Sequence, residues 1–187
     1  MQQQNNFSND VERILLTRQQ VQKRVEELGA QITRDYQGKD LLMVSVLKGS
    51  VVFMADLMRA IHLPAEIDFM MVSSYGAASK SSGVVKIVKD IDIELKGKDL
   101  LIVEDILDSG RTLSYLKELL EGRDPASVRI VTLLDKPARR AVPLQPDYTG
   151  FEVPDEFIVG YGLDYAEHYR NLPDIGVLKK EVYTKEV

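Results

Sequence analysis

The sequence predicts an α/β fold in which a mostly parallel central sheet is flanked by helices. Three short runs, at residues 41–47, 100–103 and 128–134, are almost entirely apolar, as is typical of buried parallel strands. Segments with apolar residues at helical spacing lie between these runs, and glycine-containing turns separate strand from helix. This alternation indicates a single α/β sheet, so we expect one domain over residues 1–187.

The N-terminal part of the chain predicts a tail and one amphipathic helix. Residues 1–10 are polar and aperiodic, which is typical of a flexible tail. After a short apolar stretch at 11–16, Thr17 and Gln20 have the spacing of a capping box, and Gly38 is a plausible stop. The apolar residues between them recur at helical spacing: Val21, Val25, Leu28 and Ile32.

The middle of the chain predicts a strand, a glycine turn and a helix, followed by further strands. Strand 41–47 leads through the turn at 48–50 into a helical pattern that extends to Ile61. A strand at 67–72 precedes a small, polar segment at 73–83, which resembles an active-site lid as much as a solvated hairpin loop. Alternation then predicts strands at 84–88 and 91–95.

The second half repeats the order of strand and helix. Strand 100–103 runs into Glu104 and Asp105, and a loop ending at Gly110 precedes a helix at about 112–121. Strand 128–134 precedes a basic loop at 135–140. Residues 141–156 contain three prolines and are predicted to be mostly irregular, and short strands are expected at 157–159 and 175–178.

Composition and charge exclude several classes of protein. The chain has 24 basic and 29 acidic residues, a net charge of −5, which argues against a nucleic-acid partner. It has no cysteine and only 2 histidines, which leaves no thiolate site and makes a zinc centre or histidine-based triad improbable. Neither a signal peptide nor an apolar run long enough to span a bilayer is evident, so we expect a cytoplasmic protein without membrane contact.

Residues 104–112 are the most informative segment for chemistry. Three carboxylates precede a turn that opens a helix, where backbone N–H groups, two hydroxyls and a glycine suit a phosphate monoester. The adjacent acids, Glu104 and Asp105, are suitable acceptors for the vicinal hydroxyls of a ribose. The alternative is that Asp108 or Ser109 simply caps the helix and that the acids are a solvated strand end. No P-loop motif is present, and Gly160 and Gly162 do not complete a dinucleotide-binding motif.

Residues 103–112 resemble the phosphoribosyl-pyrophosphate motif of the type I phosphoribosyltransferases. Four further segments follow the order found in the hypoxanthine-guanine members of that family: 47–50, the loop from Ser73, 135–140 and 157–165. The resemblance covers roughly residues 40–178. It implies the type I phosphoribosyltransferase fold, with a small hood region and a mobile lid.

The resemblance implies roles for the residues of the acidic turn. Glu104 and Asp105 match the pair that handles the ribose hydroxyls, and Asp108 matches a residue near purine N7 that is proposed as general base or acid. The loop that holds the 5′-phosphate is matched by Ser109, Gly110, Arg111 and Thr112.

Pyrophosphate and magnesium sites are also implied. Lys48 and Gly49 match the pyrophosphate loop, often with a non-proline cis peptide after Leu47, and Arg170 matches an arginine that contacts pyrophosphate. Mg²⁺ is the implied cofactor, with Glu104, Asp105 and Asp164 as its candidate ligands. Without the family, a Lys-Gly-Ser turn is more often only a turn, and the two charged residues at 164 and 170 could be surface charges.

The remaining matches concern the base and the lid. Lys136 matches the residue that contacts the purine 6-oxo group, because the carbonyl oxygen of that group can accept a hydrogen bond from the lysine ammonium. Phe157 matches the aromatic that stacks on the purine, the backbone of Ile158 matches the position that reads its edge, and Ser74 and Tyr75 match the lid. On spacing alone, a solvated basic patch around Lys136 and a core phenylalanine would be favoured.

The implied activity is purine salvage: transfer of the ribosyl group of 5-phosphoribosyl 1-pyrophosphate to hypoxanthine or guanine, giving IMP or GMP. Two alternatives stay open, namely a preference for xanthine and a non-catalytic regulator that senses nucleotides with the same fold. The retained Asp108 and the acidic net charge favour the enzyme. The family also implies a homodimer or homotetramer.

Overall fold

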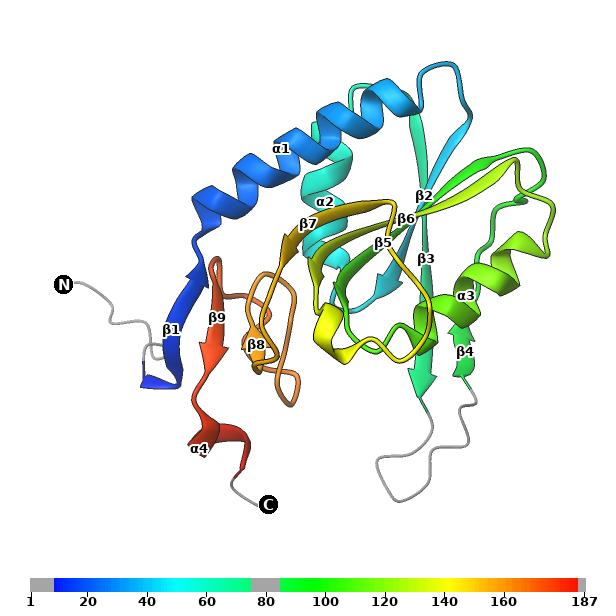
Figure 1. Cartoon of the computed structure of the whole chain (residues 1–187). Helices are drawn as coiled ribbons and strands as arrows, with labels where there is room; N and C mark the ends of the chain where they lie inside the picture. The colour runs from blue at the N-terminus through cyan, green and yellow to red at the C-terminus, as the bar shows by residue number, and fades with distance from the viewer. Residues whose placement is uncertain (1–8, 75–84, 185–187) are drawn as a thin grey trace.

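The computed structural model describes residues 9–74 and 85–184, and a six-stranded sheet forms the centre of the molecule (Figure 1). Only its edge strand β4 is antiparallel to its neighbour, so the predicted mostly parallel sheet is confirmed. The strands follow the order β4 (Val85–Lys89), β3 (Ala65–Ser74), β2 (Leu41–Leu47), β5 (Asp99–Leu107), β6 (Ser127–Asp135) and β7 (Tyr148–Glu152). Among the described residues, no helix is long and apolar enough to cross a membrane.

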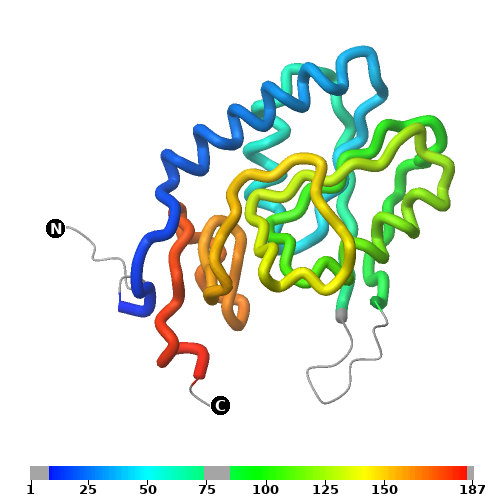
Figure 2. The backbone as a smooth tube through the Cα atoms, in the orientation of Figure 1, coloured from blue at the N-terminus to red at the C-terminus, as the bar shows by residue number. Residues whose placement is uncertain are grey.

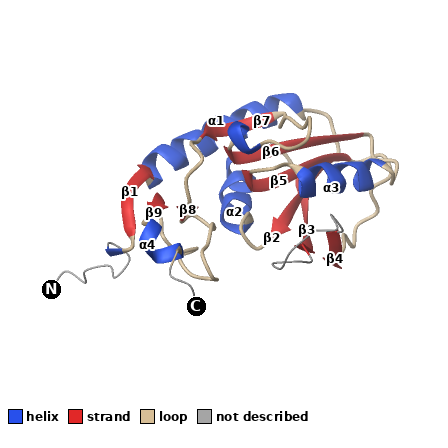
Figure 3. Cartoon of the chain, turned by 60° about the horizontal axis from the view of Figure 1, so that its bottom comes forward, coloured by secondary structure: helices blue, strands red, loops and turns tan. Residues whose placement is uncertain are grey.

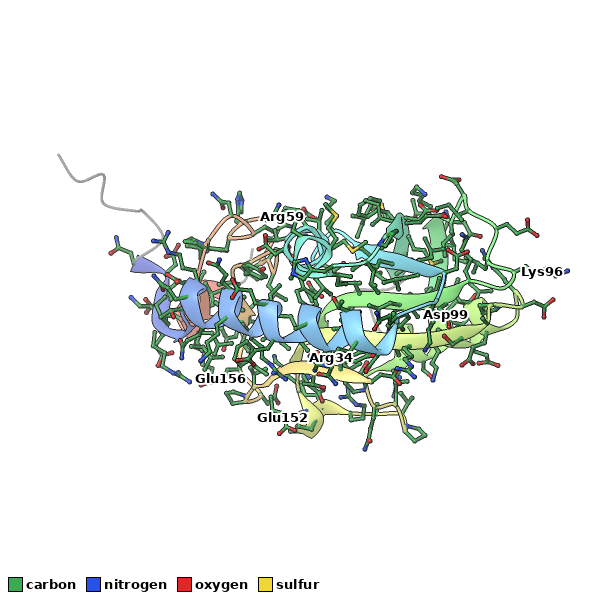
Figure 4. All side chains as sticks on the ribbon, turned by 90° about the horizontal axis from the view of Figure 1, so that it is seen from above. Arg34, Arg59, Lys96, Asp99, Glu152 and Glu156 are labelled. Atoms are coloured by element: carbon green, nitrogen blue, oxygen red, sulfur yellow. The ribbon has the colours of Figure 1, made fainter. Side chains whose placement is uncertain are left out.

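Helices cover both faces of this sheet. Two helices, α1 (Arg18–Asp35) and α2 (Val51–Ala60), lie side by side on one face (Figures 1 and 4). The third, α3 (Arg111–Glu121), packs on the other face. Alternate residues of the central strands point to opposite sides, so Met43 contributes to the first core and Val44 to the second. The almost entirely apolar runs at 41–47 in β2 and 100–103 in β5 are explained by this burial on both faces.

Helix α1 begins as the sequence predicts. The Thr17 hydroxyl accepts a 3.3 Å hydrogen bond from the Gln20 N–H, and the Gln20 side chain accepts a 2.9 Å bond from the Thr17 N–H. These reciprocal bonds satisfy N–H groups that have no partner within the helix. The helix ends at Asp35, before the predicted stop at Gly38, and its buried face includes the four predicted residues, Val21, Val25, Leu28 and Ile32.

A separate, three-stranded antiparallel sheet forms the hood. Its order is β1 (Val11–Leu16), β9 (Ile175–Leu178) and β8 (Ile158–Val159), and it lies beside the larger sheet (Figures 2 and 3). A short helix, α4 (Lys180–Tyr183), follows β9. Most of the predicted tail lies outside the described residues, but Asn9 and Asp10 are not free, because both accept hydrogen bonds from Lys179.

Three sequence predictions are wrong in detail. Residues 91–95 form no strand, because the N–H groups of Asp92 and Ile93 donate to the buried carboxylate of Asp68 rather than to a neighbouring strand. The strand predicted at 100–103 continues to Leu107. Residues 141–156 contain β7, because the prolines lie on either side of this edge strand rather than within it.

The topology places a crevice between β2 and β5. The chain passes from β2 through α2 to β3 on one side, and from β5 through α3 to β6 on the other. In open α/β sheets, ligands bind beyond the carboxyl ends of strands at such a switch point. The turn at 48–50 and the acidic turn at 104–112 therefore meet at one place.

Candidate active site

At the switch point the turn at 48–50 contacts both strand β5 and the loop around Gly162, and glycines allow both approaches. A Cβ added at Gly49 would lie 1.8 Å from Asp105 Oδ2, and a Cβ at Gly162 would lie 2.1 Å from the Gly49 carbonyl oxygen. Gly162 also has a φ of +103°. The peptide between Leu47 and Lys48 is cis, as the resemblance implied. A side chain at Gly49 would overlap the Asp105 carboxylate of β5, and a side chain at Gly162 would overlap the Gly49 backbone, so each approach favours glycine.

The acidic pair lies within strand β5 rather than at a solvated end. Burial, and then the neighbouring Asp105 carboxylate, raise the pKa of Glu104 well above its usual range. Burial raises the pKa of Asp105 to about 6, although backbone N–H groups oppose the shift. Glu104 Oε2 is buried without a hydrogen-bond partner among the described residues. Two adjacent, half-buried carboxylates with an unsatisfied oxygen suit a bound cation or ribose hydroxyls.

The turn after β5 leaves the start of α3 open to an anion. The N-cap residue is Gly110, whose φ of +78° favours glycine, and no side chain caps the helix. The Ser109 hydroxyl accepts only a long, 3.5 Å hydrogen bond from Arg111. The capping alternative is therefore wrong for both Asp108 and Ser109. The first N–H groups of the helix, at residues 111–113, precede the first intrahelical bond, which Ser114 donates to Gly110, so they suit a phosphate.

Asp108 is held at the end of β5 by two arginines that follow β6. Arg139 Nε lies 2.7 Å from Asp108 Oδ1, and Arg140 Nη1 donates a 2.6 Å hydrogen bond to the Asp108 carbonyl oxygen. Arg140 also pairs with the buried Asp135. Asp108 is nevertheless 44% exposed at its side chain, so one side of the carboxylate is accessible to a ligand.

The residues predicted to contact the base line one pocket of about 560 Å³ together with Asp108 and Asp164. Lys136 is 7% exposed, and its Nζ donates a 2.5 Å hydrogen bond to the Glu156 carbonyl oxygen. Burial lowers its pKa. A solvated basic patch is therefore wrong for Lys136. Phe157 is 36% exposed, so it is not a core residue, whereas Ile158 is buried in β8.

The two basic side chains that are predicted to bind pyrophosphate share one acidic partner, which sequence reasoning missed. Lys48 Nζ lies 3.0 Å and Arg170 Nη2 lies 3.4 Å from the same oxygen, Glu167 Oε2. Arg170 Nη2 also lies 3.0 Å from Asp164 Oδ1. Glu167 is 119 residues from Lys48, so the spacing of the two residues does not predict that they pair. The one local signal is that Glu167 lies between Asp164 and Arg170 in the sequence.

The structure describes only part of the predicted lid and does not bring the predicted metal ligands together. Ser74 is the last residue of β3, and Tyr75 lies outside the described residues. The predicted metal ligands are not gathered into one centre, since no group of three or more acidic or histidine side chains among the described residues is arranged to hold a metal ion. Asp105 and Asp164 nevertheless line the same pocket.

The chain is similar in sequence to known proteins along most of its length. The phosphoribosyl transferase domain family matches residues 13–166. The hypoxanthine-guanine phosphoribosyltransferase of Bacillus subtilis is 57% identical over 177 residues, which cover 95% of this chain and 98% of that protein. The bifunctional protein TilS/HprT of Listeria innocua is 54% identical, and the chain spans only 27% of its length.

A solved structure shows the same fold. The crystal structure of a hypoxanthine phosphoribosyltransferase from Staphylococcus aureus superimposes with a TM-score of 0.94 at 51% identity. The match covers 98% of this chain and 100% of the other.

Proposed function

The chain belongs to the type I phosphoribosyltransferase family, and from that premise we propose that it is a purine-salvage enzyme that makes IMP and GMP from hypoxanthine and guanine. One observation carries the proposal: the acidic pair, the open start of α3 and the Lys136 pocket meet at a single crevice. A polyanionic donor does not cross a bilayer, so we place the reaction in the cytoplasm.

The residues divide the reaction between them. N–H groups at 109–112 hold the 5′-phosphate, and Lys48 and Arg170 hold the pyrophosphate. As the C1′–O bond to pyrophosphate breaks and the bond from C1′ to purine N9 forms, positive charge builds on the ribose ring. The Asp108 carboxylate accepts the proton that the base loses at N7 and stabilises the developing cation.

The acidic pair fits a hard cation. Glu104 Oε2 lacks a partner, and a positive charge would offset the mutual repulsion of Glu104 and Asp105. Asp105 and Asp164, which line one pocket, would hold Mg²⁺ with Glu104 beside them, because Mg²⁺ keeps several water or substrate oxygens and needs no complete protein cage. When bound, Mg²⁺ neutralises charge on the pyrophosphate that leaves.

Replacing Lys136 by Ala is expected to raise KM for hypoxanthine about 10- to 100-fold, because the 6-oxo group loses a charge-assisted hydrogen bond. Steady-state kinetics at saturating donor measure this. Lys96→Ala is the control, because Lys96 lies at the end of the molecule away from Glu156, the hydrogen-bond partner of Lys136 (Figure 4). An equal rise in KM for the donor would assign Lys136 to a phosphate instead.

Replacing Glu167 by Gln is expected to tighten binding of pyrophosphate about two- to fivefold, because the exposed carboxylate competes for Lys48 and Arg170. The inhibition constant for pyrophosphate as a product inhibitor measures this binding. Glu66→Gln, which removes a partner of Lys98 away from the site, is the control. Weaker inhibition in the Glu167 variant would mean that this carboxylate holds the two cations in place for the ligand.

We also propose that the enzyme forms a homodimer or homotetramer. Val51 and Met58 on α2 are 41% and 38% exposed, and Ile67 on β3 is 40% exposed. Ile67 pairs in register with Met43, so it lies on the face of the sheet that α2 covers. These apolar side chains suit contact with a second copy. Sedimentation equilibrium tests this, and a monomer at micromolar concentration would contradict it.

The experiment that tests the proposed function is nucleotide synthesis by the purified protein from hypoxanthine, 5-phosphoribosyl 1-pyrophosphate and Mg²⁺. We expect IMP and pyrophosphate in equal amounts. Binding of the donor or of IMP without turnover would favour the regulator in place of the enzyme.

A further inference from the structure

The ring of Phe157, the proposed stacking surface for the base, contacts two tyrosine rings. Tyr183 stacks on it with the ring centroids 4.8 Å apart and an angle of 23° between the planes. Tyr165 meets it edge-on, at 5.5 Å and 90°. Tyr183 also lines the pocket that contains Asp108 and Lys136. The tyrosine at 183 has no part in the site as the sequence predicts it, although it lies against one of its central residues.

The side chain of Phe157 depends on these neighbours for its orientation. Its backbone is fixed, because the Phe157 carbonyl oxygen accepts a 2.8 Å hydrogen bond from the Leu178 N–H. Phe157 is 36% exposed, and its ring is free to rotate about the side-chain torsions unless other groups hold it. A purine gains from stacking only when the two planes are offset and nearly parallel. A ring held in one plane therefore binds the base better than a rotating one.

The C-terminal segment is tied where it can hold Tyr183 against Phe157. After β9, the Lys179 N–H donates a 2.9 Å hydrogen bond to Asp10, and Lys179 Nζ donates a 2.5 Å bond to Asn9. The short helix α4 then turns the chain, and the Thr184 N–H donates to Lys180 at 3.0 Å. Tyr183 is 26 residues from Phe157 in the sequence, and these contacts bring the two rings together.

We propose that Tyr183 is a positioning residue for the purine base, which fixes the plane of the Phe157 ring from the face that the base does not use. The base then stacks on the other face of the Phe157 ring, whose plane is inclined by 23° to that of Tyr183. This inference rests on the proposed function, since it assigns Tyr183 to the base subsite of that reaction. It implies that Tyr183 affects the base and leaves the ribose and phosphate contacts unaffected.

The test compares Tyr183→Ala and Tyr183→Phe with the wild-type protein. We expect Tyr183→Ala to raise KM for hypoxanthine about three- to tenfold with little change in kcat or in KM for the donor. Isothermal calorimetry should show a roughly three- to tenfold weaker affinity of this variant for IMP and an unchanged affinity for ribose 5-phosphate, which has no base. Tyr183→Phe keeps the aromatic face and should restore both the KM for hypoxanthine and the affinity for IMP. Tyr115→Ala, which removes an exposed tyrosine of α3, is the matched control.

Two results would overturn the inference. Tighter binding of IMP to Tyr183→Ala would mean that the tyrosine occupies the place of the base, and unchanged binding would remove it from the site. Tyr183→Leu, which keeps apolar bulk without an aromatic plane, replaces the alanine variant if that variant melts early. Failure of the proposed function is a separate result, because it appears as absence of turnover in the wild-type protein.

Discussion

Replacing Asp108 by Asn lowers kcat about 10²- to 10⁴-fold, as expected for the loss of a general base. The amide keeps the size of the side chain and its place beside Arg139, but it cannot take the proton from purine N7. Donor binding should change little, because the phosphates contact other groups. Single-turnover kinetics with donor prebound separate the chemical step from binding.

A neighbouring carboxylate supplies the control for this variant. Asp155 pairs with the same arginine, with its Oδ1 3.2 Å from Arg139 Nη1, so Asp155→Asn makes a similar electrostatic change without removing the proposed base. We expect its kcat to stay close to that of the wild-type protein. If the Asp108→Asn variant has the kcat of the wild-type protein, Asp108 is not the group that accepts the proton.

The second large effect is expected from Gly49→Ala. A methyl group there would lie 1.8 Å from Asp105 Oδ2 and 2.8 Å from its Cγ, so either the Asp105 carboxylate must turn away or the pyrophosphate loop must shift. We expect KM for the donor to rise at least about tenfold, together with a loss of stability of about 1–3 kcal/mol from overpacking. Donor kinetics and thermal unfolding measure the two effects.

Gly122→Ala is the matched control for Gly49→Ala. Gly122 has a φ of −68°, and an added Cβ would make only ordinary contacts, the nearest at 3.5 Å. This variant should keep both its stability and its KM for the donor. Normal donor use by Gly49→Ala would show that the contact with Asp105 is not needed to hold pyrophosphate.

Local patterns in the sequence predict much of the fold. The apolar run at 41–47 gives the bounds of β2, and Thr17 with Gln20 gives the start of α1. Both depend on residues close together in the chain. The irregular 91–95 segment depends on a buried carboxylate at Asp68, 23 residues before its first residue, and β7 depends on pairing with β6. Contacts of this kind leave no local pattern.

The candidate site divides in the same way. The turn at 104–112 carries its chemistry within nine residues and could be predicted. The burial of Lys136, which excludes a solvated patch, depends on the segment around Glu156. Sequence reasoning misses three residues of the site, because each one contacts a partner that is distant in the sequence or belongs to a separate motif. They are Arg139, Glu167 and Tyr183. Residue type alone gives such positions no distinction from other surface residues.

The most direct test of the central claim, transfer of a ribosyl group to a 6-oxopurine at this crevice, is a comparison of kcat/KM for four bases. Hypoxanthine, guanine, xanthine and adenine are each assayed with 5-phosphoribosyl 1-pyrophosphate and Mg²⁺. Because Lys136 donates and does not accept hydrogen bonds, we predict rapid use of hypoxanthine and guanine and little use of adenine. A protein that uses adenine as well as hypoxanthine, or that uses none of the four, would contradict the account.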